Sequence, residues 1–193
     1  MDILFRGGSP LAERAHVQTF AGLVASDPAF IGHNVYTVAG YGHTTFDLIW
    51  DFDEEIQPVE PGLLVLQFGV DDMYRPVYRS EFKENLVQAI RRARLRFNPT
   101  ILLCTTHLLR TAYENDAAGI YNRTTREVAT DLGCHYVSLH LVWMNHLHQK
   151  GITVDDLLED DSRFPSQAGH MVTADTIKTR IQQLINTAAG YSV

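Results

Sequence analysis

Short apolar runs alternate along the chain with longer segments in which apolar residues recur at helical spacing. The runs are rich in aliphatic, β-branched and aromatic residues and are bounded by glycine, proline or small polar residues, which is typical of strands. The run at 63–68 is continuously apolar, as expected for a strand buried on both faces of a parallel sheet. Five such runs predict strands, at 3–5, 34–38, 63–68, 101–104 and 135–139.

Segments with helical periodicity lie between and after these strands. The clearest covers 80–97, where apolar residues follow an i, i+4, i+7, i+8, i+11 stripe and Asn98-Pro99 ends it. The periodicity also predicts helices over 11–25, after Thr44-Thr45, before Gly133 (with Ile120 and Tyr121 facing inward) and after Pro165. Strands that alternate with helices predict an α/β fold, in which a five-stranded parallel sheet is covered on both faces. At this length, we expect a single three-layer domain over 1–193.

Polar or glycine residues follow four of the predicted strands. They are Ser9, Gly42, Asp71 and His107. Ligands of parallel α/β sheets bind beyond the carboxyl ends of the strands, so these residues are expected to share one pocket. Ser9 follows a strand and two glycines, where a serine is either a nucleophile or the cap of a helix.

Charge, cysteine content and the length of the apolar runs limit the class of protein and of its partner. The chain has 16 basic and 23 acidic residues, a net charge of −7, which disfavours nucleic acid or an anionic membrane as partner. The two cysteines, Cys104 and Cys134, are too few for a disulfide framework and are expected to be buried apolar residues. The first strand begins near the start and no apolar run reaches the length of a membrane span, so we expect a cytoplasmic protein.

Four sequence blocks resemble, in order, those of the SGNH (GDSL-type) hydrolase superfamily. They are Gly7-Gly8-Ser9, the glycine Gly42 within GYGHTTFDL, Gly69-Val70-Asp71-Asp72, and the stretch from Asp161 to His170. The helix segment before the last predicted strand, YNRTTREVATDLGCHYVSLH, also looks like the superfamily. This resemblance implies a flavodoxin-like α/β/α fold over nearly the whole chain.

The resemblance also implies roles for particular residues. In the superfamily the serine attacks an ester carbonyl, a histidine is its general base and an aspartate orients that histidine. The serine N–H, the glycine N–H of the second block and an asparagine of the third block hold the oxyanion. On these positions the chain keeps Ser9, Gly42 and Asp161.

The chain departs from the superfamily at three positions. Phe164 stands where the histidine is expected, Asp71 replaces the oxyanion asparagine, and Gly8 replaces the aspartate beside the serine. A phenylalanine accepts no proton, so Ser9 lacks its usual base, and Phe164 instead becomes a candidate aromatic wall of the pocket. An ionised Asp71 only accepts hydrogen bonds and would repel an oxyanion. Burial near Asp72 and Asp161 favours its protonated form, which could donate.

A base recruited from elsewhere is an open alternative. His43 follows the oxyanion glycine and His107 follows the fourth strand, although a capping or surface histidine explains either one. Further candidates that could line the pocket are Tyr41, Tyr74, Arg75, Arg110 and Arg163. An arginine among them could bind a carboxylate or phosphate. No metal-binding, nucleotide-binding or dinucleotide motif is present, so we expect neither metal nor cofactor.

Three functional hypotheses follow from the sequence. The leading one is an SGNH-fold enzyme that acts on a small-molecule metabolic intermediate by a non-standard acid/base mechanism using Asp71, His107, His43 and Asp161. The second is a catalytically silent relative that binds a ligand or a partner. The third is a residual esterase in which a displaced histidine activates Ser9.

Overall fold

The protein contains one sheet of five parallel strands, in the order β2-β1-β3-β4-β5. The computed structural model describes residues 1–188, so the last five residues of the predicted domain, 189–193, lie outside the described part. The strand order confirms the predicted flavodoxin-like α/β fold. The strands are β1 (Asp2–Gly7), β2 (Asn34–Ala39), β3 (Leu63–Gln67), β4 (Thr100–Cys104) and β5 (His135–Val137).

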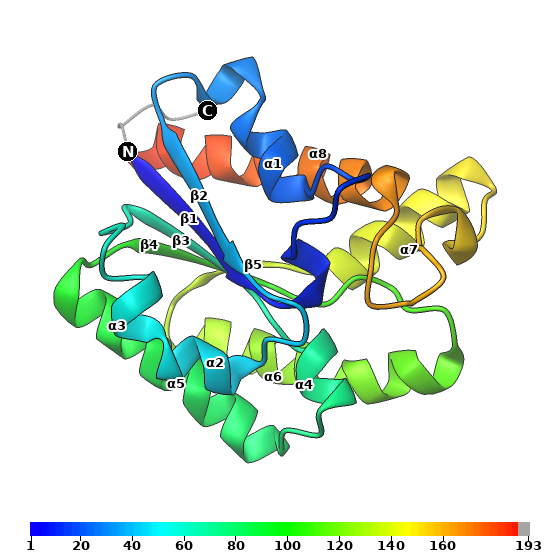
Figure 1. The fold of residues 1–193 in the computed structure, drawn as a ribbon, viewed down its shortest axis with the longest axis horizontal. Helices are drawn as coiled ribbons and strands as arrows, with labels where there is room; N and C mark the ends of the chain where they lie inside the picture. Colours follow the sequence, from blue (N-terminus) through cyan, green and yellow to red (C-terminus); the bar gives the residue numbers. More distant parts are fainter. Residues whose placement is uncertain (189–193) are drawn as a thin grey trace.

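Helices cover both faces of the sheet, as Figure 1 shows, with α1, α7 and α8 on one side and α2 to α6 on the other. Thr44 and Thr111 cap α2 and α6 through their side chains, which explains why these helices begin where they do. The α-helices are α1 (Phe20–Ala25), α2 (Thr45–Trp50), α3 (Phe52–Glu55), α4 (Val70–Tyr74), α5 (Arg79–Arg96), α6 (Ala112–Asp131), α7 (Leu139–Lys150) and α8 (Gln167–Ala188). Three short 3₁₀ helices are η1 (Ser9–Leu11), η2 (Pro28–Phe30) and η3 (Val154–Asp156).

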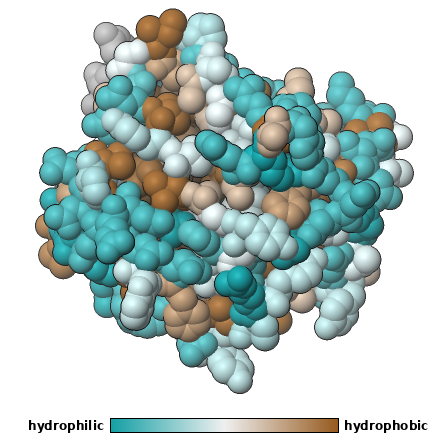
Figure 2. Space-filling view, in the orientation of Figure 1, coloured by the Kyte–Doolittle hydropathy of each residue, from teal (hydrophilic) through white to brown (hydrophobic). Residues whose placement is uncertain are grey.

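Alternate residues of each strand enter two separate hydrophobic cores. Leu4 and Leu64 pack with α2, α3, α5 and α6, whereas Phe5 and Val65 pack with α1 and α8. Successive side chains of a strand point to opposite faces, so strands covered on both sides must be apolar at every position. Figure 2 shows hydrophilic residues over much of the helical layers and hydrophobic residues between them, where β2 forms an edge of the sheet.

The register of the central strands brings their carboxyl ends to one edge. Gly7 at the end of β1 lies opposite Ala39 of β2 and Gln67 of β3, and Gln67 lies opposite Cys104 of β4. The loops that follow these strands therefore meet beyond a single edge of the sheet. Cys104 is buried and Cys134 partly buried, and both are free thiols.

Some predicted elements were wrong in extent. The predicted helix over 11–25 is helical only at η1 and at α1, and the backbone at Ala12 is extended. The intervening segment contacts the loop before α8 instead: Arg14 donates to the Pro165 carbonyl, and the N–H of Gln18 donates to the Gln167 side chain. These tertiary contacts outweigh the local helical spacing.

Two smaller corrections concern the second half of the chain. Ile120 of α6 is exposed, whereas Tyr121 beside it is buried as expected. Strand β5 ends at Val137, and Leu139, which was assigned to the strand, begins α7. Over residues 1–188, none of the helices combines the length and the apolar character needed to cross a membrane.

Candidate active site

Three of the four residues predicted to share a pocket lie together beyond the carboxyl edge. Ser9 begins η1 directly after β1, Gly42 lies in the loop after β2, and Asp71 lies in the first turn of α4 after β3. Gly42 and Gly69 have φ values of 74° and 114°, the left-handed region that glycine adopts most easily. These glycines turn the chain so that Gly42 and Asp71 face Ser9.

Ser9 and Asp71 are joined by two short hydrogen bonds. The Ser9 N–H donates to Asp71 Oδ2 and the Ser9 hydroxyl donates to Asp71 Oδ1, each at 2.6 Å. The N–H of Gly42 donates to Ser9 Oγ at 2.9 Å. The carboxylate of Asp71 thus occupies the N–H donor of Ser9, and Ser9 Oγ occupies that of Gly42.

The Asp71 carboxylate is enclosed by protein. Ser9 is 0% exposed and Asp71 is 2% exposed. Burial raises the pKa of Asp71, because the ionised form loses hydration, while the two Ser9 hydrogen bonds and the nearby Arg163 and Arg75 counteract this rise. A carboxyl group bonded to a serine hydroxyl and held at a raised pKa is suited to accept and return a proton.

Gly8 leaves the space that Asp71 occupies. A Cβ atom on residue 8 would overlap Asp71 Oδ2 and the carbonyl oxygen of His43, at separations well below the 3.0 Å that real Cβ atoms keep. The aspartate that the superfamily has at this position would meet the same two atoms. The two departures at residues 8 and 71 are therefore sterically compatible with each other.

Asp72, the neighbouring carboxylate, is held by hydrogen bonds from Thr45 and Gly69. Its Oδ1 accepts hydrogen bonds from the N–H and the hydroxyl of Thr45, and its Oδ2 accepts one from the N–H of Gly69. Burial raises its pKa to about 6, although these hydrogen bonds stabilise the ionised form. Asp72 joins the start of α2 to the start of α4, and so supports the loop that carries Asp71.

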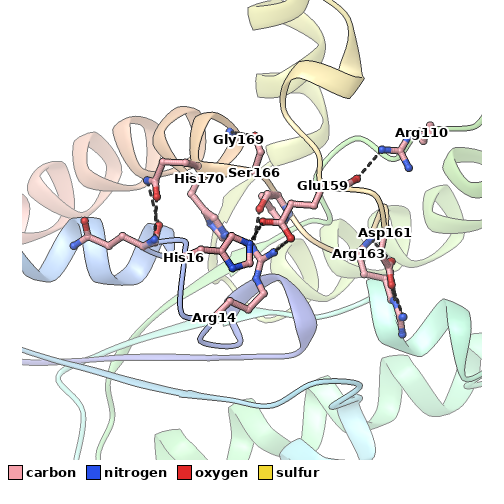
Figure 3. Close-up of polar contacts among 12 residues, drawn as sticks. Arg14, His16, Arg110, Glu159, Asp161, Arg163, Ser166, Gly169 and His170 are labelled. Atoms are coloured by element: carbon pink, nitrogen blue, oxygen red, sulfur yellow. Dashed lines mark hydrogen bonds and ion pairs between the residues drawn. The ribbon is translucent and has the colours of Figure 1, made fainter.

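Asp161 pairs with Arg163, whose charge acts on Asp71. Arg163 Nε donates to both Asp161 oxygens at 3.0 Å, and its terminal nitrogen donates to the Tyr41 hydroxyl as well. Figure 3 shows the Asp161–Arg163 pair in the loop before α8. The hydrogen bonds from Arg163 hold the pKa of Asp161 below its ordinary value. Asp161 is thus engaged by an arginine.

Phe164 is held in a stack of side chains. Its ring lies parallel to that of Tyr41, with centroids 5.6 Å apart and an interplanar angle of 15°. The guanidinium of Arg14 lies 4.7 Å from the Phe164 centroid. Figure 3 shows Arg14 and His16 converging on Glu159, which anchors the segment after η1 to the loop before α8. The Phe164 ring therefore packs against both Tyr41 and Arg14, and its role as a wall of the pocket stays a prediction.

His107 is not among the hydrogen-bond partners of Ser9 or Asp71, so the structure shows no contact for its expected role beside Ser9. Its ring is buried against Trp143, with centroids 5.0 Å apart, and its Nε2 lies 2.8 Å from the carbonyl oxygen of Ser162. Nδ1 has no partner among the described residues. Burial lowers its pKa to about 4, so the ring is neutral at pH 7. His107 therefore holds the loop before α8 against α7.

His43 lies beside Arg6 and Gly40. Its Nδ1 is 3.3 Å from a terminal nitrogen of Arg6, and its ring fills the space beside Gly40, where a Cβ would overlap it. The ring supports the loop that presents the Gly42 N–H. Among residues 1–188, no three His, Cys, Asp or Glu side chains are grouped so that they could hold a metal ion.

Sequence reasoning missed the buried cation Arg6. Its side chain is 0% exposed, lies 2.5 Å from Glu55 of α3 and donates to the Gly7 carbonyl. Burial lowers the pKa of Arg6 and the Glu55 carboxylate counteracts this. A charged residue inside the first apolar run was the available signal. Arg6 ties the end of β1, just before Ser9, to α3.

The comparisons with known proteins agree with this architecture. Residues 6–172 match the model of the GDSL-like lipase/acylhydrolase family. The chain belongs to this family. Its fold is similar to that of the acetylxylan esterase Axe2 from Geobacillus stearothermophilus, with 19% identity, 91% of each chain covered and a TM-score of 0.78. The acetyl xylan esterase AlAXEase gives 18% identity, 94% of this chain, 100% of that chain and a TM-score of 0.79. A search of curated protein sequences gave no match.

Three solved variants of Axe2, with alanine in place of a serine, an aspartate or a histidine, are described as catalytic mutants.

Proposed function

We propose that the protein is an enzyme in which Asp71 and Ser9 together transfer a proton to and from a small-molecule intermediate, outside the Ser-His-Asp scheme. The observation that carries this proposal is the 2.6 Å hydrogen bond from the Ser9 hydroxyl to Asp71 Oδ1, in a site whose burial raises the pKa of Asp71. A small molecule fits better than a nucleic acid as the substrate, because the net charge is −7.

The proton balance of the proposed step is simple. Ser9 Oγ accepts a proton from an acidic C–H or O–H of the substrate as it passes its own proton to Asp71 Oδ1. The Gly42 N–H stabilises charge that develops on Oγ during the transfer. Return of the proton to another substrate atom gives an isomerisation, and departure of a leaving group gives an elimination or a cyclisation.

Ester hydrolysis through Ser9 is a weaker fit to this geometry. A tetrahedral oxyanion needs free donors, but the Ser9 N–H already binds Asp71 and the Gly42 N–H already binds Ser9 Oγ. An ionised Asp71 beside the developing charge would also repel it. A displaced histidine is not supported either, since His107 binds the Ser162 carbonyl and His43 lies against Arg6.

One observation favours a second candidate, a catalytically silent ligand-binding member of the family. Ser9 and Asp71 satisfy each other's hydrogen bonds and are covered by protein. A substrate reaches them only after neighbouring residues move. A silent relative would bind ligands there without converting them.

The test uses a metabolite extract in D₂O, followed by untargeted mass spectrometry. We expect the wild-type protein to convert at least one compound with uptake of solvent deuterium, and Asp71→Asn and Ser9→Ala to abolish the conversion. Asp116→Asn, which changes an exposed aspartate on α6, is the matched control and should convert like wild type. Conversion by Asp71→Asn at the wild-type rate overturns the proposal.

Two further results would favour the alternatives. Ligand retention without any conversion by the wild-type protein favours the silent relative. Covalent labelling of Ser9 by a fluorophosphonate probe, at the rate of a serine esterase, favours a serine nucleophile and contradicts the proposed role of Asp71.

A further inference from the structure

We infer that Arg75 anchors a carboxylate group of the ligand at the mouth of this site. The inference rests on the proposed function, because it assigns the chemical class of the compound that the Ser9–Asp71 pair would act on. It extends that proposal to the residues that select the ligand.

The position of Arg75 is the first observation. Its guanidinium lies against Gly42, with a terminal nitrogen 3.0 Å from where a Cβ of residue 42 would stand. The N–H of Gly42 donates to Ser9 Oγ, so Arg75 packs on the residue that holds the Ser9 hydroxyl. Arg75 also lies close enough to Asp71 to lower the pKa of that carboxyl group. A ligand group bound by Arg75 would therefore adjoin the Ser9–Asp71 pair.

The second observation is that Arg75 is exposed and unpaired. Across residues 1–188, no carboxylate forms an ion pair with Arg75, and its guanidinium donates no hydrogen bond. The neighbouring Arg163 differs, because it is held by Asp161 and by the Tyr41 hydroxyl. The five N–H donors of Arg75 are free to form a bidentate pair with a planar anion.

Aromatic rings surround the neighbouring Arg163. The Arg163 guanidinium lies 4.7 Å from the Tyr41 ring centroid and 5.3 Å from that of Tyr74. Tyr41 also stacks on Phe164. These rings favour a flat compound, and the single positive charge of Arg75 balances one carboxylate but not the two negative charges of a phosphate.

Calorimetric titration with benzoate, benzamide and inorganic phosphate tests this assignment. Benzoate and benzamide have nearly the same shape, so the difference between them measures the contribution of the charge. We expect benzoate to bind at least about tenfold more tightly than benzamide, and Arg75→Gln to remove that preference. Arg91→Gln, which changes an exposed arginine on α5, should keep it.

Amide chemical shifts locate the bound probe. Benzoate should shift the Gly42 and Tyr41 amide resonances in the wild-type protein, and should not shift them in Arg75→Gln. Equal binding of benzoate and benzamide, or unchanged benzoate binding by Arg75→Gln, overturns the inference. Phosphate that binds more tightly than benzoate, with the same dependence on Arg75, overturns the assignment to a carboxylate.

These outcomes are separable from those of the proposed function. If benzoate binding depends on Arg75 while Asp71→Asn still converts a substrate, the anchor stands and the proton-transfer role of Asp71 fails. If Asp71→Asn abolishes conversion while benzoate binds independently of Arg75, the proton-transfer role stands and the anchor fails.

Discussion

Gly8 and Asp71 occupy adjoining space in such a way that a side chain on residue 8 would displace the Asp71 carboxylate. This steric relationship links two of the three departures from the superfamily pattern. It places the carboxylate on the N–H and the hydroxyl of Ser9.

Gly8→Ala should therefore destabilise the protein. Overpacking of a tightly filled site costs about 1–3 kcal/mol, and we expect a decrease of this size in the free energy of unfolding measured with urea. Gly8→Ala should destabilise an Asp71→Ala protein less than it destabilises the wild type, because the overlap with the Asp71 carboxylate is absent. The destabilisation that remains reflects the overlap with the His43 carbonyl. Gly119→Ala in α6, where only the end of Arg123 is near, is the control and should not destabilise. Equal stability of Gly8→Ala and wild type would contradict the steric argument.

Ser9→Ala should raise the pKa of Asp71 further. The Ser9 hydroxyl donates to the ionised carboxylate and so lowers its pKa, and this contribution is lost in the variant. A ¹³C NMR titration of the Asp71 carboxyl carbon measures the shift directly. Ser80→Ala, at an exposed position on α5, should leave the titration unchanged. A lower or equal pKa in Ser9→Ala would show that this hydrogen bond does not form in solution.

His107→Gln should weaken the loss of stability in acid. The pKa of His107 is about 4 in the folded protein and about 6.5 when unfolded, so only the unfolded chain takes up this proton as the pH falls from 6.5 toward 4. The contribution of His107 to the free energy of unfolding is therefore fully present above pH 6.5 and decreases on acidification. The decrease between pH 7 and pH 5 is about 2 kcal/mol. Urea titrations at both values should show a smaller difference in His107→Gln, but not in His148→Gln, at an exposed histidine of α7. Equal differences in wild type and His107→Gln would contradict the lowered pKa.

The double variant Phe164→His with Asp71→Asn should gain esterase activity. It introduces a base and an oxyanion donor at the positions where the sequence resemblance expects them. We expect hydrolysis of p-nitrophenyl acetate about tenfold or more above wild type, because loss of the triad histidine is among the most costly changes in serine hydrolases. Adding Ser9→Ala should abolish the gain. Activity that survives Ser9→Ala would come from a different site.

The sequence predicted the sheet and the position of Ser9 well, for a physical reason. Strands buried on both faces must be continuously apolar, so β1, β3 and β4 are visible as short apolar runs that end at glycine or polar residues. Because the ends of parallel strands meet at one edge, the approach of Gly42 and Asp71 to Ser9 followed from their places after strands.

The sequence did not determine the direction of side chains or the pairing of distant segments. His107 follows a strand as Asp71 does, but its ring turns toward Trp143, which lies on a helix well downstream. The ion pair of Arg6 with Glu55 joins parts of the chain that no local pattern connects. The helix predicted over 11–25 was interrupted by contacts such as that of Arg14 with Pro165.

The burial of Ser9 and Asp71 has a kinetic consequence, because a ligand reaches them only after neighbouring segments move. Tyr41 and Arg14, from two other segments, both pack on the Phe164 ring, so these segments would move together. Such collective motions take microseconds to milliseconds, far longer than the rotation of a single exposed side chain. Ligand association should therefore be limited by opening, and its observed rate should level off as the ligand concentration rises.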